Sequence, residues 1–154
     1  MRRFALAVIT ALVIGVPFVH PVSEGSAAFS IFSSHKKVKD AGGKIQIPIS
    51  DVDDGKAHYY QYKNGGSTVK FFVVKSSDGI IRAAFDACDV CFPAKKGYSQ
   101  DGDFMVCNNC GRRFHSSRIN VVKGGCNPAP LNREVAGEHL VINVADVIPG
   151  SRFF

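Results

Sequence analysis

The alternation of hydrophobic and polar residues along the chain predicts a series of short β-strands. In residues 44–50, KIQIPIS, isoleucine occupies every second position, as expected for a half-buried strand. Pro48 lacks an amide hydrogen, which places this strand at a sheet edge or makes it irregular. Residues 58–63, HYYQYK, and 68–75, TVKFFVVK, predict two further strands joined by a tight turn at residues 64–66, NGG.

The later part of the chain continues this pattern. Residues 80–87, IIRAAFDA, predict a strand that runs directly into Cys88, and residues 104–106, FMV, predict another. Residues 139–147, HLVINVADV, predict a last strand, or a strand that passes into a short turn. Because the strands are short and closely spaced, and no amphipathic helix of normal length stands out, the sequence predicts a small, mainly β domain of antiparallel strands.

The amino-terminal residues predict export. Arg2 and Arg3 precede a nearly unbroken apolar run at residues 4–19, and residues 26–28, SAA, suit signal-peptidase cleavage before Phe29. The alternative is an uncleaved N-terminal anchor helix, because the run approaches the ~20 residues that span a bilayer and the arginines would stay in the cytoplasm. In either case the rest of the chain lies outside the cytoplasm. We divide the chain into a signal peptide or membrane anchor (1–28), a tether (29–43) and a β domain (44–154).

The composition is typical of one globular domain and gives no sign of nucleic-acid binding. Hydrophobic residues make up 45% of the 154 residues, enough for one core. The formal charge is +6, and without residues 1–28 the 17 basic and 12 acidic side chains leave about +5. No aromatic-and-basic stripe or recognition-helix pattern accompanies this mild excess, so we expect no nucleic-acid partner.

The strongest chemical signal is the spacing of the cysteines. All five lie between positions 88 and 126, and four form two CxxC pairs, Cys88/Cys91 and Cys107/Cys110, with fifteen residues between the pairs. Two cysteines on a tight turn can point both sulfurs at one ion, and a ribbon-like hairpin can bring two such turns face to face. The pattern predicts a tetrahedral sulfur site for zinc, mononuclear iron or an iron–sulfur cluster, and the spacing alone does not choose among them.

Cys126 is a fifth thiol in the turn-rich segment 124–128, GGCNP. An unpaired thiol in an exported protein calls for a role. It could be an extra ligand to a cluster, a ligand that exchanges with one of the other four, a resolving thiol or a small buried side chain. We favour the first two roles.

Other charged residues near the cysteines give weaker signals. His115, in RRFHSSRINVV, is expected to be a strand residue rather than a ligand, and Asp86 and Asp89 are interpreted as turn and surface groups. No serine-hydrolase, Walker or dinucleotide motif is present, so an independent enzyme is not expected. Basic side chains outnumber acidic ones between positions 92 and 124. Their positive field either favours thiolates and an acidic redox partner, or these charges form only a solvated rim. These cations are Lys95, Lys96, Arg112, Arg113, Arg118 and Lys123.

Two alternatives to a redox metal centre stay open. The first is a zinc ribbon whose ion has a purely structural role and whose loops meet a partner. The second is thiol–disulfide chemistry, because an exported chain meets an oxidising environment and CxxC is also a thiol-exchange motif. Neither CxxC pair begins a helix after a strand in a βαβ unit, which argues against a thioredoxin-like oxidoreductase.

Several motifs in this order resemble the FtrD-like domain of membrane iron–sulfur proteins. They are FDACxxC at residues 85–91, CxNCGxxF at 107–114 and GGCNP at 124–128, followed by ADVIPGSRFF at the carboxyl end, and the likeness covers residues 42–154. The resemblance implies an iron–sulfur or related metal centre in a protein that is periplasmic, or anchored in the inner membrane and facing the periplasm. On this pattern the metal-linked positions are Cys88, Cys91, Cys107, Cys110 and Cys126.

The same resemblance implies a role for the protein. The implied role is that of an accessory in electron transfer or metal handling, in ferrous iron uptake or respiration, beside membrane redox or iron-permease proteins. This chain has only one apolar segment, so any permease or electron-channel function would need another polypeptide.

Overall fold

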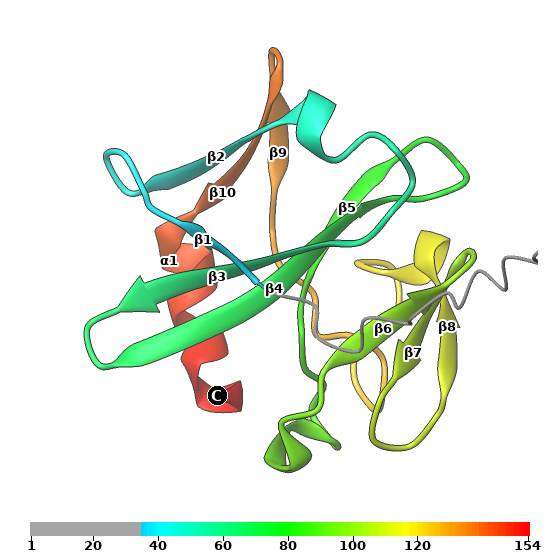
Figure 1. Ribbon diagram of the computed structural model, residues 1–154. Helices are drawn as coiled ribbons and strands as arrows, with labels where there is room; N and C mark the ends of the chain where they lie inside the picture. Colours follow the sequence, from blue (N-terminus) through cyan, green and yellow to red (C-terminus); the bar gives the residue numbers. More distant parts are fainter. Residues whose placement is uncertain (1–34) are drawn as a thin grey trace, which may run out of the picture. The chain divides into compact units, whose positions relative to one another are not determined.

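The computed structural model describes residues 35–154 and confirms a mainly β domain (Figure 1). This part of the chain forms three small sheets, one short α-helix and several 3₁₀ turns. The strands are β1 (Lys36–Val38), β2 (Lys44–Pro48), β3 (His58–Asn64), β4 (Ser67–Lys75), β5 (Ile81–Phe85), β6 (Tyr98–Asp101), β7 (Phe104–Cys107), β8 (Arg113–His115), β9 (Glu134–Ala136) and β10 (His139–Asn143). Their pairings are antiparallel except for that of β1 with β3.

The first sheet has the order β1-β3-β4-β5 and contains the longest strands. β3 and β4 form the hairpin expected from the sequence, with Asn64 paired to Ser67 across the turn. Gly65 in this turn has a φ of +56°, a left-handed conformation that glycine adopts without a steric penalty. β5 pairs with β4 and ends three residues before Cys88, so the first CxxC pair lies at a strand end as expected.

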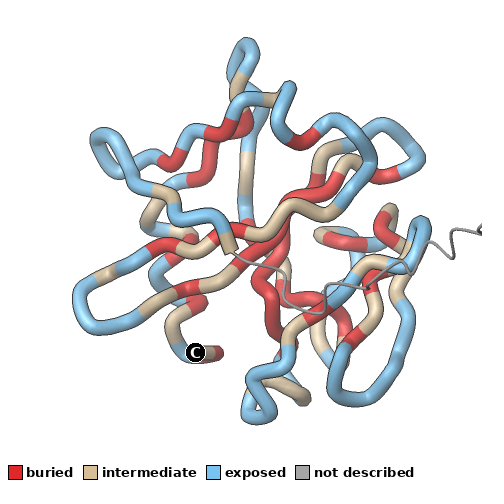
Figure 2. Tube along the Cα trace, viewed as in Figure 1, coloured by how far each residue is buried: buried red, intermediate tan, exposed pale blue. Residues whose placement is uncertain are grey.

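β4 separates two hydrophobic cores, because its side chains point alternately to opposite faces of the sheet. Phe71 and Val73 pack into the larger core, and Phe72 and Val74 pack into the smaller one. Figure 2 shows buried residues running along the β4 and β5 segments through the middle of the domain. The smaller core includes two of the cysteines, Cys88 and Cys107, so the first sheet supports the cysteine region directly.

Each of the other two sheets packs into one of these two cores. The second sheet, of order β2-β10-β9, buries Ile45 and Ile47 of β2 in the larger core, while the alternate residues of β2 are exposed. β2 is an edge strand, as Pro48 predicted, because β10 is its one pairing partner in the sheet. The third sheet, of order β6-β7-β8, contributes Tyr98 and Met105 to the smaller core and carries the second CxxC pair between β7 and β8.

Three features differ from the sequence-based expectations. Residues 36–38, which the sequence assigned to the tether, form β1 and pair with residues 60–62 of β3. β6 and β9 were not expected, because strands of three or four residues give too short an alternation to detect. After β10 the chain enters a short helix, α1 (Val144–Val147), and then a 3₁₀ turn (Ile148–Phe153), which is more structure than the single turn expected.

The predicted leader, including its possible anchor helix, lies outside the described residues. Within residues 35–154, no helix has the length and apolar character needed to span a bilayer. Because β1 already pairs with β3, we propose that the folded domain begins at or before His35 rather than at Lys44.

Candidate metal centre

The five cysteine sulfurs come together at one place in the domain. The sulfurs of Cys88, Cys91 and Cys126 lie within 4.8 Å of one another, and so do those of Cys91, Cys107 and Cys110. Cys91 therefore belongs to both groups. Cys88 and Cys107 are buried, Cys91 and Cys126 are half-buried and Cys110 is exposed, and all five are free thiols. The cluster thus extends from the smaller core to the surface.

The first CxxC pair is shaped by its own backbone. The amide of Cys91 donates a hydrogen bond to Cys88 Sγ at 3.2 Å, which folds the four-residue turn back on its first sulfur. The amide of Phe92 donates to the carbonyl oxygen of Cys88, also at 3.2 Å. A 3₁₀ turn (Phe92–Ala94) follows and ends at Lys95, whose left-handed φ of 53° redirects the chain toward β6. The CxxC spacing thus becomes a compact turn with both sulfurs on one side.

The second CxxC pair uses the same kind of turn between β7 and β8. The amide of Gly111 donates to the carbonyl oxygen of Cys107 at 2.8 Å, and the φ of Gly111 is +71°, which accounts for glycine at this position. A hydrogen bond from the amide of Arg112 is the main reason that the pKa of Cys110 is lowered to about 7. Burial raises the pKa of Cys107 to about 11. Backbone amides therefore already favour a thiolate at the exposed end of the cluster.

Cys126 reaches the other four sulfurs because the chain after it runs beside β5. The amide of Phe85 donates to the carbonyl oxygen of Ala129, and the amide of Ala129 donates to the carbonyl oxygen of Ala87. These two bonds, with one from the amide of Leu131 to the carbonyl oxygen of Ala83, place residues 129–131 next to the strand that leads into the first CxxC pair. Cys126 Sγ lies 3.9 Å from Cys91 Sγ. The sequence identified Cys126 as a candidate, and the structure brings its sulfur into the cluster.

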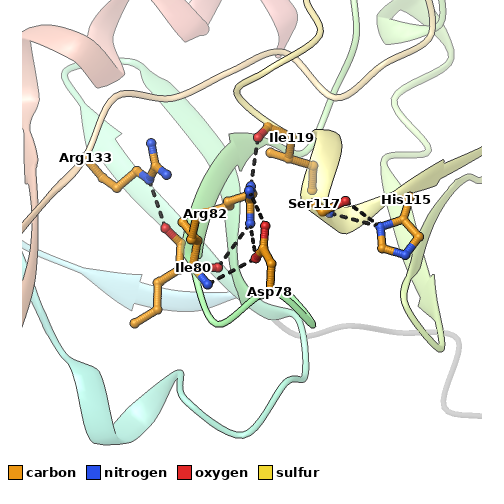
Figure 3. Close-up of polar contacts among 8 residues, drawn as sticks. Asp78, Ile80, Arg82, His115, Ser117, Ile119 and Arg133 are labelled. Carbon is orange, nitrogen blue, oxygen red and sulfur yellow. Dashed lines mark hydrogen bonds and ion pairs between the residues drawn. The ribbon is translucent and has the colours of Figure 1, made fainter.

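The buried side chain of Arg82 binds the chain segment that precedes Cys126 (Figure 3). Arg82 of β5 is 4% exposed and donates through Nε to the carbonyl oxygen of Ile119 at 3.1 Å. Its two terminal nitrogens each donate to one carboxylate oxygen of Asp78 at 2.7 Å, which compensates the buried charge. Asn120 Nδ2 then donates to the carbonyl oxygen of Ala83 at 2.9 Å. The segment that leads to Cys126 is thus held against β5 at two successive residues.

The burial of Asp86 differs from the interpretation made from the sequence. Asp86 was expected to be a turn or surface group, but it is 8% exposed and its carboxylate accepts two hydrogen bonds. Oδ1 accepts from the amide of Tyr98 at 2.7 Å, and Oδ2 lies 3.0 Å from Nε2 of His35. A methyl group on Gly97 would lie 2.5 Å from the carboxylate, so glycine is needed there for the close approach. Asp89, in contrast, is exposed as expected.

Tyr98 was not identified from the sequence, although it lies at the centre of the site. Its side chain is 2% exposed, and its hydroxyl donates to the carbonyl oxygen of Cys126 at 2.6 Å. Burial raises the pKa of this phenol, with a further contribution from Cys88, so the hydroxyl keeps its proton and acts as a donor. A tyrosine in a short, unpredicted strand carries no spacing signal that would have identified it.

His115 lies apart from the sulfurs, as expected. It belongs to β8, where Nδ1 contacts the hydroxyl of Ser117 at 2.7 Å and its ring packs edge-on against Phe104 at 5.2 Å. It belongs to neither sulfur group. The donor set in the described part of the chain therefore consists of cysteine sulfurs.

The surface beside the exposed end of the cluster is basic. Lys95, Lys96 and Arg112 are exposed, and Lys95 lines the same small pocket as Cys91 and Cys107. Arg113 forms an ion pair with Asp101, so its charge is partly balanced. The unbalanced cations lie where an anionic metal–thiolate centre would meet the solvent.

The donor set fits a soft or borderline metal. Thiolates select zinc, iron and iron–sulfur clusters over hard cations such as calcium or magnesium. Burial, with a smaller effect of the Cys110 and Cys91 thiols, raises the pKa of Cys126 to about 12, and a cation bound to this sulfur would favour its thiolate form. Two sulfurs that share one tetrahedral ion at about 2.3 Å lie about 3.8 Å apart, close to the Cys91–Cys126 separation of 3.9 Å.

The fold and the site define a β domain with a cysteine-rich metal centre. A family model described as "Membrane iron-sulfur containing protein FtrD-like" matches residues 52–154. The chain therefore belongs to the FtrD-like family of membrane-associated iron–sulfur proteins, and family and cysteine cluster together support an iron–sulfur or other metal cofactor. No curated protein matches the chain.

Among solved structures, one similar chain is the quaternary ammonium Rieske monooxygenase CntA in complex with the inhibitor MMV12. The identity is 16% and the TM-score 0.43, and the match covers 64% of this chain and 30% of the monooxygenase chain. This chain thus spans less than a third of that protein's length, and the likeness carries no conclusion about function.

Proposed function

We propose that this protein is an exported accessory that holds an iron or iron–sulfur centre and transfers electrons, or hands over iron, beside a membrane partner. The observation that carries the proposal is the convergence of five cysteine sulfurs in a member of the FtrD-like family. Cys88, Cys91, Cys107, Cys110 and Cys126 would hold the centre. When bound, such a centre supplies one-electron chemistry at a potential set by its surroundings.

The protein's own residues would give this centre a closed side and an open side. Cys88 and Cys107 lie in the smaller core, which excludes water and fixes their positions. Cys110 is exposed and beside Arg112, so charge could enter or leave at this end. Backbone amides near Cys88 and Cys110 donate to sulfur, and hydrogen bonds of this kind help set the reduction potential of the centre.

Two other functions remain to be separated from this one. Zinc would fit the same sulfurs and would make the centre purely structural, with the loops as a binding surface. One observation supports thiol–disulfide exchange: the Cys110 thiol is exposed and its pKa is lowered to about 7.

Anaerobic purification of the exported chain, with elemental analysis, visible spectroscopy and electron paramagnetic resonance, tests the proposal. We expect iron and a visible absorbance that bleaches with dithionite. A colourless protein with one zinc per chain would contradict the redox function and favour the structural one. A metal-free protein in which a Cys110→Ser change removes disulfide exchange would favour the oxidoreductase.

The proposed location is the periplasm, either free or anchored in the inner membrane through residues 1–28. The proposal draws on the apolar run at residues 4–19 and on the membrane association of the family. The mass of the exported chain decides between the two forms, because cleavage before Phe29 removes a leader that an anchored chain keeps. A full-length chain found only in the cytoplasm would contradict both.

The proposed partner is a membrane redox or iron-permease protein with an acidic face. Exposed Lys95 lines the small pocket of Cys91 and Cys107, and exposed Lys96 follows it in the chain, so both would attract such a partner electrostatically. We expect reversal of both charges, Lys95→Glu with Lys96→Glu, to slow association with the partner and to weaken its dependence on salt. The matched control reverses Lys37 and Lys39, exposed lysines at the β1 edge. Equal effects of the two pairs, measured by stopped-flow reduction at several ionic strengths, would show that the charges near the cluster are only a solvated rim.

A further inference from the structure

Tyr98 connects all three chain segments that supply the cysteines. Its amide donates to Asp86, two residues before Cys88, and its Cα pairs with that of Cys107 across β6 and β7. Its hydroxyl donates to the carbonyl oxygen of Cys126 at 2.6 Å. The backbone of Tyr98 thus fixes the two CxxC pairs relative to each other, and its side chain reaches the fifth cysteine.

We propose that the Tyr98 hydroxyl is a positioning group that holds Cys126 in the ligand shell of the metal centre. The inference rests on the proposed function only in assuming that the cluster binds a metal. It assigns Cys126 as a ligand, and it assigns Tyr98 as the residue on which that ligation depends.

The segment around Cys126 needs such an external support. Gly124 and Gly125 precede Cys126 with φ values of +83° and +63°, and residues 119–133 contain no regular strand or helix. The ladder beside β5 begins only at Ala129. Among the described residues, Asn127 bonds only within this loop, to the carbonyl oxygens of Gly124 and Val122, so the bond from Tyr98 is a contact that ties the backbone of Cys126 to the rest of the domain. The bond is part-buried, so water would replace the lost donor only in part.

The tyrosine ring is itself held in place, so its hydroxyl has little freedom to follow a moving loop. The ring packs against that of Phe72 with centroids 6.3 Å apart, and Phe72 is fully buried. This packing fixes the point from which the hydroxyl reaches Cys126. The hydroxyl of Tyr59 donates to the carbonyl oxygen of Tyr98 at 3.0 Å, but the backbone of Tyr98 is held independently by its pairing with Cys107 and its bond to Asp86.

The test compares Tyr98→Phe with Tyr59→Phe in the full chain as purified with its metal. Each change removes one phenol hydroxyl that donates to a backbone carbonyl, but the Tyr59 bond touches no cysteine. The first readout is the alkylation rate of each cysteine by iodoacetamide, followed by peptide mass spectrometry. In the wild type we expect Cys126 to be protected although it is half-exposed. Tyr98→Phe should raise its rate by about tenfold, the scale on which outer-shell partners affect metal binding.

The second readout is spectroscopic and follows the ligands directly. Tyr98→Phe should change the thiolate-to-metal charge-transfer absorbance of the purified protein, or of its cobalt form if the native ion is colourless zinc, while Tyr59→Phe should leave it unchanged. A wild-type Cys126 that reacts as fast as a free thiol in metal-loaded protein would overturn the inference, as would faster alkylation without a change in this absorbance. Equal effects of the two variants would also overturn it. If the wild type holds no metal by elemental analysis, the proposed function fails first, and with it the ligand role of Cys126.

Discussion

Replacing Cys91 with serine is expected to abolish stable metal binding. Cys91 is the one cysteine whose sulfur belongs to both groups in the cluster, so its loss takes a ligand from each. A serine hydroxyl is a poor ligand for zinc or iron beside thiolates, because these metals select soft sulfur donors. We expect the affinity to fall by more than the ~100-fold that loss of an outer-shell partner causes. Elemental analysis of the purified chain and competition with a chromophoric chelator would measure the loss.

Cys110→Ser provides the comparison for this prediction. Cys110 belongs to one sulfur group and is exposed, so solvent can occupy its place and Cys126 stays within the other group. We expect this variant to keep a larger share of its metal than Cys91→Ser. The prediction that Cys91 is the central ligand would be wrong if Cys91→Ser kept the wild-type metal content. It would also be wrong if Cys110→Ser lost more metal than Cys91→Ser.

Truncating Phe72 to alanine is expected to damage both stability and the metal centre. The side chain is fully buried in the smaller core, together with Cys88, Cys107 and Tyr98. Phe→Ala changes in a core cost about 3–5 kcal/mol, through lost burial and the cavity left behind. We therefore expect a lower urea midpoint of unfolding. Because this cavity adjoins the sulfurs, we also expect a lower affinity for the metal. Phe72→Leu, with a smaller cavity, should show both effects more weakly, and it provides a folded variant if the alanine form is too unstable.

Phe71 is a closely matched control because it neighbours Phe72 on β4 and is equally buried, but on the opposite face. Phe71→Ala should lower the urea midpoint by a comparable amount, since it leaves a cavity of similar size in the larger core. Its cavity lies across the sheet from the cysteines, so the metal affinity of the folded protein should change little. If both variants lost metal to the same degree, the smaller core would have no specific role in supporting the centre.

The sequence predicted the parts of the site that depend on local spacing. The two CxxC pairs and the strand that leads into Cys88 were recognisable, because a tight turn needs a fixed number of residues and a strand has a fixed alternation. The hairpin at residues 64–66 was predicted for the same reason, and the edge position of β2 because Pro48 lacks an amide hydrogen. A role for Cys126 stayed open, since its sulfur meets Cys91 only through a loop of 34 intervening residues.

The tertiary structure decided which polar side chains are buried around that site. Asp86 was expected at the surface, but Tyr98 and His35, from distant points in the chain, enclose its carboxylate. β1 was expected to be part of a tether, because three residues are too few to show a strand alternation in the sequence. It is a strand because it pairs with β3. Such contacts depend on sheet registry and on which residues fold back across the chain, and no local pattern encodes them.

By itself, the sequence determined that the site is built from cysteine sulfur, because cysteine pairs at this spacing place sulfur in tight turns whatever surrounds them. Only the tertiary structure decided how that chemistry is arranged. The pairing of residues 129–131 with β5 and the bond from Tyr98 bring the fifth sulfur into the cluster, beside Cys88 and Cys91. The alternation of β4 places two of the sulfurs in a core of their own. Turns form from neighbouring residues, whereas a shared shell of ligands requires segments far apart in the chain to pack together.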